Sequence, residues 1–327
     1  MDAHETFPYG DIPDLSVRIA GIRFRNPVIA ASGTFGYGRE YQGLLNMASL
    51  GGICTKGLTL HPRQGNTGLR IYETPAGLLN SIGLENPGIL EFIERELPAL
   101  RELGPVVIAN LSGSTVEEYI EGARLLAGSP VDMIELNISC PNVKAGGMAF
   151  GLEPRPAASV VQAVRKVCDK PLMVKLSPNA PDLRAVARAC VAAGADALSL
   201  VNTFQAMAID IYKRKPVFQY ISAGLSGPGI RPLALRMVWD LWEAVKVPLV
   251  GLGGIAAAED ALEFLMAGAA AVQVGSATFA HPPLMVEIIQ GIAGYMQHYK
   301  ITKIEDLSIR GTSSFTVHHE KQKTRLY

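Results

Sequence analysis

Short apolar runs recur along the chain, and each is followed by a longer segment in which apolar and polar residues alternate with a helical period. The runs are continuously apolar, which is typical of parallel strands buried on both faces. Eight runs fit this description: Val28–Ala31, Gly52–Thr55, Val106–Asn110, Met133–Asn137, Leu172–Leu176, Ala197–Val201, Leu249–Leu252 and Ala271–Val274. The pattern therefore predicts eight buried parallel strands.

Helices are predicted between these strands, and several have recognisable ends. Thr115-x-x-Glu118 has the form of a capping box, and Asn86-Pro87 combines a cap residue with a proline that favours the first turn. A glycine follows four of the segments, as at many helix ends. The predicted helices are Glu40–Met47, Asn86–Leu103, Thr115–Leu126, Ala157–Val167, Pro181–Ala193, Pro232–Val245, Ala256–Ala267 and Pro283–Tyr299.

Eight alternations of strand and helix predict a single α/β domain, a (β/α)₈ barrel over residues 1–311 with a polar tail over 312–327. An open doubly wound sheet is the alternative. A dinucleotide-binding sheet of that kind would carry GxGxxG after its first strand, whereas Ser32–Gly38 does not match. The long gaps at Pro62–Leu84 and Asn142–Gly151 would lie at the carboxyl ends of the barrel strands, where active sites form.

Composition narrows the range of functions. Of the 327 residues, 48% are hydrophobic and 18% charged, which excludes a wholly disordered chain. Thirty Lys and Arg balance thirty Asp and Glu, so nothing indicates a nucleic-acid partner. We expect no membrane span, because no apolar run reaches about 18 residues. The acidic start of the chain and the four cysteines without a CxxC pair lead us to expect a cytoplasmic protein without a metal site.

Glycines after the last two predicted strands indicate an anion site. Gly251–Gly254 and Gly275-Ser276 each precede a predicted helix, so backbone N–H groups there can approach a phosphate. The alternative is that these glycines only form tight turns. Lys56 and Lys175 each end a strand, where they would stabilise a negative charge, form an imine or extend their ammonium groups into water.

Cys140 follows the fourth predicted strand and precedes Pro141, which places it in a sharp turn. There it would act as a base or nucleophile, or be a small buried hydrophobe. For Cys54, Cys168 and Cys190 we expect burial. Asparagines are also frequent near strand ends, and several converging amides would suit a planar, imide-rich ligand, unless they serve as turn and cap residues. They are Asn80, Asn86, Asn110, Asn137, Asn142 and Asn202.

A series of motifs runs in order from about residue 16 to 311. They are Asn26-Pro with Ala31-Ser-Gly-Thr-Phe-Gly, Thr55-Lys-Gly, Asn80-Ser-Ile-Gly-Leu-Glu-Asn-Pro-Gly, Asn137-Ile-Ser-Cys-Pro-Asn-Val-Lys, Val174-Lys-Leu-Ser-Pro, Leu200-Val-Asn-Thr, Gly224-Leu-Ser-Gly-Pro, Gly251-Leu-Gly-Gly-Ile and Gly275-Ser-Ala. Together they resemble dihydroorotate dehydrogenase, specifically the catalytic subunit of its NAD-linked, two-subunit class. Glu85, where glutamine is common, and Ser276, where threonine is common, are the visible departures.

The resemblance implies an FMN-dependent oxidation of (S)-dihydroorotate to orotate in pyrimidine biosynthesis. It implies that Cys140 is the base that removes the C5 proton, that the C6 hydride passes to flavin N5, and that the loop after Cys140 closes over the substrate. The implied substrate-binding residues are Lys56, Asn80, Ser81, Ile82, Gly83, Leu84, Asn137, Asn202 and Thr203. The implied FMN-binding residues are Ser32, Lys56, Gly57, Asn110, Asn137, Lys175, Val201 and Gly227, with Gly253, Gly254, Gly275 and Ser276 at the phosphate.

The resemblance also implies a partner. In the NAD-linked class the electrons reach NAD⁺ through a subunit with FAD and a 2Fe–2S cluster, in a heterotetramer of two catalytic and two electron-transfer chains. The homodimeric, fumarate-linked class also uses a cysteine and is the nearest alternative; Pro141–Gly147 favours the NAD-linked class. The membrane-bound quinone class has serine at the base position. A non-redox phosphate-binding barrel, such as a lysine-imine lyase, and a ligand-binding barrel without catalysis are alternatives of other kinds.

Overall fold

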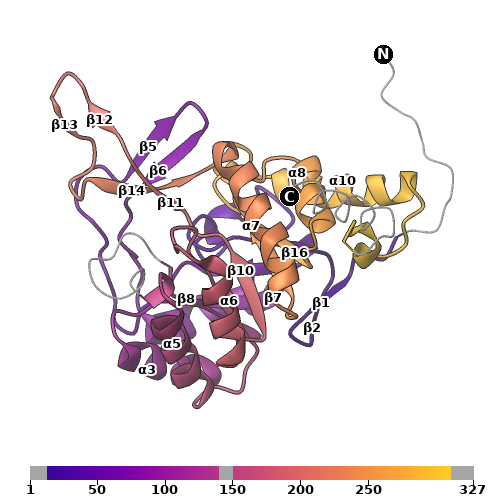
Figure 1. Ribbon diagram of the computed structural model, residues 1–327, viewed down its shortest axis with the longest axis horizontal. Coiled ribbons are helices and arrows are strands. Elements are labelled where there is room, and N and C mark those ends of the chain that lie inside the picture. The colour runs from indigo at the N-terminus through magenta and orange to yellow at the C-terminus, as the bar shows by residue number, and fades with distance from the viewer. Residues whose placement is uncertain (1–12, 140–149, 311–327) are drawn as a thin grey trace, which may run out of the picture.

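The computed structural model describes residues 13–139 and 150–310. Eight parallel strands close into a barrel at its centre, in the order β3-β4-β7-β8-β9-β10-β15-β16 (Figure 1). Their bounds are β3 Val28–Ala30, β4 Gly52–Cys54, β7 Val106–Leu111, β8 Met133–Asn137, β9 Leu172–Lys175, β10 Ala197–Leu200, β15 Leu249–Leu252 and β16 Ala271–Val274. Each predicted run is one barrel strand, with ends within one residue of those expected. The barrel is confirmed, and the open sheet is wrong.

Helices pack around the outside of this barrel, as the alternating pattern predicts (Figure 1). The longer ones are α3 Val116–Ala127, α5 Pro154–Arg165, α6 Leu183–Ala192, α7 Arg231–Ala244, α8 Ala258–Met266 and α10 Leu284–His298. Shorter ones are α1 Ile89–Glu91, α2 Leu97–Glu102 and α9 Ala277–Ala280, with a π-helical turn at Phe92–Glu96 and 3₁₀ turns at Arg39–Tyr41, Met47–Ser49, Pro228–Ile230 and Ile304–Leu307. Thr115 caps α3, its side chain accepting from the Glu118 N–H at 3.3 Å. None of these helices combines the length and apolar character that a membrane crossing needs.

Two helix predictions need correction. The segment Glu40–Met47 forms only 3₁₀ turns at its two ends, with Gly43 at a φ of +78° between them, a backbone conformation that interrupts a helix. The helix expected from Asn86 begins at Ile89 instead. The Asn86 side chain accepts from the N–H groups of Gly88 and Thr59, so it joins two loops rather than capping a helix.

A second sheet stands beside the carboxyl end of the barrel (Figure 1). It consists of β5 Ile71–Thr74, β6 Gly77–Asn80, β11 Phe204–Met207 and β14 Ser222–Ser226, in the order β11-β14-β6-β5. The pair β12 Ile209–Asp210 and β13 Lys215–Pro216 projects from it, and β1 Val17–Ile19 and β2 Ile22–Phe24 form a separate hairpin. The long gap at Pro62–Leu84 therefore contains two strands that the sequence pattern did not predict.

Tyr119 of α3 links the outer helices to the carboxyl end of β8. Its ring is fully buried, and its hydroxyl donates to the backbone carbonyl of Asn137 at 2.8 Å. Asn137 is the last residue of β8, so this bond holds the end of a strand that carries predicted site residues.

Replacing Tyr119 by Phe removes this buried hydrogen bond and keeps the ring. We expect the free energy of unfolding to fall by about 1 kcal/mol, because the Asn137 carbonyl loses a donor inside the protein. Denaturant unfolding measures the change. The matched control is Tyr212→Phe, at a side chain that is 92% exposed; it should leave the stability unchanged. Equal stability of Tyr119→Phe and the parent chain would contradict the structural importance of this bond.

Candidate active site

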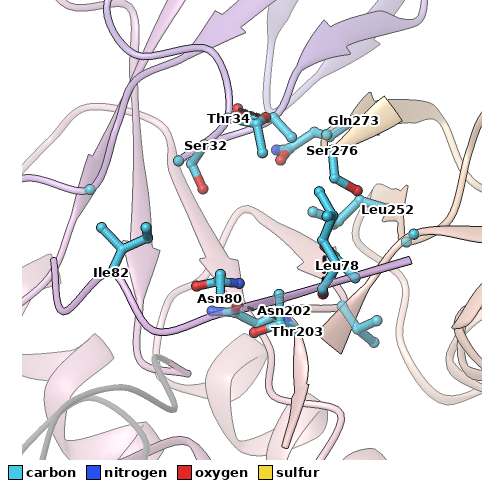
Figure 2. Close-up of a pocket in the computed structure, with 18 of the residues that line it drawn as sticks. Ser32, Thr34, Leu78, Asn80, Ile82, Asn202, Thr203, Leu252, Gln273 and Ser276 are labelled. Atoms are coloured by element: carbon cyan, nitrogen blue, oxygen red, sulfur yellow. Dashed lines mark hydrogen bonds between the residues drawn. The ribbon is translucent and has the colours of Figure 1, made fainter. Parts of the chain in front are cut away.

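A cavity of about 390 Å³ opens at the carboxyl end of the barrel, between the strand ends and the second sheet. Figure 2 shows Ser32, Thr34, Gln273 and Ser276 on one side of it and Asn80, Asn202 and Thr203 across from them. The predicted site residues that line the cavity are Ser32, Lys56, Gly57, Asn80, Ile82, Gly83, Leu84, Asn110, Asn137, Lys175, Val201, Asn202, Thr203, Gly227, Gly253, Gly254, Gly275 and Ser276.

Two predicted residues are not placed in this cavity by the structure. Ser81 is 2% exposed and lies outside the cavity lining. Its N–H donates to the Arg70 carbonyl and its hydroxyl accepts from the Asn66 amide. These bonds hold the backbone between Asn80 and Ile82, which do line the cavity. Cys140 lies outside the described residues, as does Asn142.

The carboxylate of Glu135 lies at the centre of the barrel, one inward-facing position below Asn137 on β8. It is fully buried and accepts four hydrogen bonds, two at each oxygen. The donors are Asn110 Nδ2 at 2.6 Å, Cys54 Sγ at 3.2 Å, Ser199 Oγ at 2.8 Å and Gln273 Nε2 at 2.8 Å. Lys175 Nζ is 3.7 Å from the same carboxylate and donates to Ser32 Oγ at 3.0 Å.

These contacts determine the protonation states at the inner end of the site. Burial raises the pKa of the Glu135 carboxyl, but the positive charge of Lys175 and the hydrogen bonds to the carboxylate together lower it more, so the pKa lies below its usual value. Burial, followed by the nearby Glu135 charge, raises the pKa of the Cys54 thiol well above its usual value. The site therefore holds an ionised carboxylate, with Cys54 as a protonated donor.

Three asparagine amides continue from Glu135 to the cavity surface, and we call them the amide relay: Asn110, Asn137 and Asn202. Asn137 Nδ2 donates to Asn110 Oδ1 at 3.2 Å, and Asn202 Nδ2 donates to Asn137 Oδ1 at 3.3 Å. Asn202 Nδ2 also reaches Ser139 Oγ at 2.9 Å. All three asparagines line the cavity, so the relay presents a connected set of amide groups to a ligand.

A turn of glycines forms another wall. Gly253 and Gly254 follow β15 with φ of +129° and +76°, which a side chain rarely tolerates. A Cβ at Gly254 would lie 2.8 Å from both the Arg231 nitrogen and the Gly227 carbonyl oxygen. The turn therefore packs closely against the backbone at Gly227 and Arg231, and it places both glycines in the cavity lining, where the anion site is expected.

Charged side chains surround the outer part of the cavity. Glu85 accepts from Arg70 at 2.8 Å and lies 3.7 Å from the ammonium group of Lys56, and all three residues line the cavity. They are partly exposed, so solvent screens these pairs and each contributes little to stability. Glu85 is the residue that departs from the glutamine common at its position, and here its carboxylate lies between two cations at the cavity mouth.

Sequence reasoning missed several residues of this site. Gln273 is 1% exposed and lines the cavity, and its Oε1 has no hydrogen-bond partner in the described structure. Glu135 was missed because it lies inside a strand rather than at its end. The sequence does contain a signal for both residues, because each is a single polar residue inside an otherwise apolar run: Met133-Ile-Glu-Leu for Glu135 and Ala271-Val-Gln-Val for Gln273. Arg70, which belongs to no quoted motif, and Thr34, which lies in the motif that begins at Ala31 but was given no role, also line the cavity.

Comparison with known proteins gives a consistent result. The family model described as dihydroorotate dehydrogenase matches residues 14–296. The chain is 57% identical over 294 residues to the protein named dihydroorotate dehydrogenase B (NAD(+)), catalytic subunit, of Petrotoga mobilis, covering 90% of this chain and 98% of that protein. Proteins of the same name from Geotalea daltonii and Alkaliphilus metalliredigens are 54% and 49% identical, over 90% and 91% of this chain and 97% and 98% of theirs.

Gly254→Ala tests the glycine wall. The added methyl would meet backbone atoms at 2.8 Å in a left-handed conformation, so we expect the free energy of unfolding to fall by about 1–3 kcal/mol and the affinity for a phosphate-bearing ligand to drop. Denaturant unfolding and titration with FMN measure the two effects. The control is Gly294→Ala in α10, where an added Cβ would have no atom within 4 Å beyond its chain neighbours and the backbone of its own helix, and where alanine favours the helix. Unchanged affinity in Gly254→Ala would place the phosphate elsewhere.

Proposed function

The chain belongs to the dihydroorotate dehydrogenase family, and on that premise we propose that it is an FMN-dependent catalytic subunit that oxidises (S)-dihydroorotate to orotate in pyrimidine biosynthesis. One observation carries the proposal. The residues that the resemblance assigns to the flavin and, apart from Ser81, those that it assigns to the substrate line the same cavity, although they come from segments between Ser32 and Ser276. A cofactor and a substrate that exchange a hydride must share such a space.

The cavity residues fit FMN. Gly253, Gly254, Gly275 and Ser276 line the cavity beside the first turns of α8 and α9, where backbone N–H groups can bind a phosphate. Gln273 Oε1 is a buried acceptor without a partner in the described structure, and an imide N–H of a flavin ring would satisfy it. Lys175 supplies a buried positive charge beside Ser32. When bound, FMN would supply the hydride acceptor, a role that protein side chains do not perform.

The polar residues of the outer cavity suit the substrate. Asn80, Asn202 and Thr203 lie together on one side (Figure 2) and offer amide and hydroxyl groups to a ring with two imide-type nitrogens. Lys56 supplies a cation for the substrate carboxylate. In this proposal these residues hold the ring in one orientation, and the buried ammonium group of Lys175 stabilises the negative charge that develops during the reaction.

The proposed base is Cys140. The resemblance assigns this role, and Cys140 itself lies outside the described residues. Ser139, the residue before it, accepts from Asn202 and donates to Asn137, two cavity residues. In the proposed mechanism the Cys140 thiolate removes the C5 proton of dihydroorotate, so activity should rise with pH as the thiol ionises.

We also propose an electron-transfer partner. The relatives are named catalytic subunits of NAD(+)-linked enzymes, which supports a separate subunit that passes electrons to NAD⁺. The finer proposal is a subunit with FAD and a 2Fe–2S cluster, in a heterotetramer of two catalytic and two electron-transfer chains. A homodimer that reduces fumarate is the second candidate, supported by the cysteine at position 140 that both classes share.

An anaerobic absorption spectrum of the purified chain tests this function. We expect a flavin band near about 450 nm that bleaches when dihydroorotate is added, because the substrate reduces the bound flavin. A band that persists would keep the FMN site and remove dihydroorotate as the substrate. Absence of a band after FMN is supplied would overturn the proposal and favour the lysine-imine alternative.

The acceptor is tested on the reduced chain from the same experiment. We expect NAD⁺ to restore the band only after the electron-transfer subunit of a relative is added. Rapid restoration by fumarate, without any added subunit, would favour the homodimeric class.

Cys140→Ala tests the base. We expect turnover to fall by at least about 100-fold, the usual effect of losing a general base, while the flavin band and dihydroorotate affinity persist. The control is Cys168→Ala, at a buried cysteine that lies outside the cavity lining, which should keep its turnover. Full turnover in Cys140→Ala would remove this residue from the mechanism.

A further inference from the structure

Nothing in the motifs assigns a role to Glu135, yet it has the most connected buried side chain of the site. Its carboxylate contacts side chains from β4, β7, β9, β10 and β16, and it lies on β8, so six of the eight barrel strands meet there. A buried carboxylate is costly unless it is paired and hydrogen-bonded. Glu135 satisfies both conditions, and most of its partners line the cavity.

The first consequence concerns the orientation of the amide relay. A carboxylate only accepts hydrogen bonds, so Asn110 must turn its NH₂ group toward Glu135 and its oxygen outward. That oxygen accepts from the NH₂ group of Asn137, whose oxygen in turn accepts from Asn202. Glu135 therefore sets the orientation of Asn110, and the backbone N–H groups of Ser139 and Thr203, which donate to the side-chain oxygens of Asn137 and Asn202, favour the same order along the relay.

The second consequence concerns charge. Lys175 is 4% exposed, and Glu135 is the carboxylate within 4 Å of its ammonium group. The pair places a positive charge near the cavity surface and its counter-charge deeper in the barrel. Gln273 is fixed by the same carboxylate, because its NH₂ group donates to Glu135 and so its oxygen is left for a ligand.

We propose that Glu135 is a positioning residue for the reaction: it holds Lys175, Gln273 and the amide relay in a single hydrogen-bonding arrangement and sets the charge beneath the flavin. The inference rests on the proposed function. Glu135 does not line the cavity, so it acts through the residues that do.

The test compares the FMN midpoint potential of the holoprotein in the parent chain, Glu135→Gln and Ser199→Ala. Glu135→Gln removes a buried negative charge with little change in shape, so the bound flavin should become easier to reduce. We expect the ratio of reduced to oxidised FMN at a fixed potential to rise at least about tenfold, or about 30 mV for a two-electron couple. Ser199→Ala removes one hydrogen bond to the same carboxylate but no charge, and should change the ratio less than about threefold. A Glu135→Gln protein with the parent potential overturns the proposal.

A second measurement tests the proposal if the Glu135→Gln protein does not retain FMN. Thermal unfolding of the flavin-free chains is compared for Glu135→Gln, Lys175→Met and the double variant. Breaking a buried pair leaves one uncompensated charge, whereas removing both leaves none. The double variant should therefore unfold at a higher temperature than either single variant. A double variant no more stable than the single variants overturns the pairing. This comparison needs no flavin, so it remains decisive if the parent chain proves to hold no FMN, a result that would count against the proposed function alone.

Discussion

The buried carboxylate of Glu135 constrains both the barrel and the site. A closed barrel has no strand edges, so its interior must be filled by side chains from all of its strands. At this level the filling is polar: donors from four other strands and the cation of a fifth converge on two oxygens. Such a network is stable only when every member is satisfied, which restricts the residues and rotamers allowed on six strands at once.

The same constraint explains why the site lies where it does. Asn137 lies opposite Lys175 in the register of β8 and β9, and Asn110 lies opposite Glu135 in that of β7 and β8. The residues that touch the carboxylate lie at the strand ends or one residue before them. Three of them, Asn110, Lys175 and Gln273, also line the cavity. The second sheet then closes the space from outside: β6 and β14 pair Asn80 with Gly224, and Leu78, Asn80 and Ser226 line the cavity. Many of the lining residues lie in loops, and the barrel strands that precede these loops fix where the loops begin.

The barrel could be predicted from the sequence because each strand is buried on both faces, and continuous burial leaves an uninterrupted apolar run. The second sheet could not. Its strands β5 and β11 are half-exposed and mix small, polar and apolar residues, and β6 pairs with β14 across more than a hundred residues of chain. The helix start at Asn86 failed for a related reason, since its side chain bonds to Thr59, a contact that local sequence does not reveal.

Most predicted site residues reach one cavity because the motifs occur at strand ends, and the fold brings strand ends together. The residues that sequence reasoning missed are those beneath the ends. A strand-end rule has no reason to select Glu135 or Gln273, which sit within apolar runs. Physical chemistry does supply one: a carboxylate in a fully buried strand is so costly that its presence implies donors and a cation inside the barrel. Lys175 is the cation that lines the cavity and lies closest to that carboxylate. A charged residue inside an apolar barrel strand therefore indicates that one strand-end lysine is buried beside it as its counter-charge. That lysine is Lys175, which pairs with the buried Glu135, whereas Lys56 pairs with the partly exposed Glu85 at the cavity mouth.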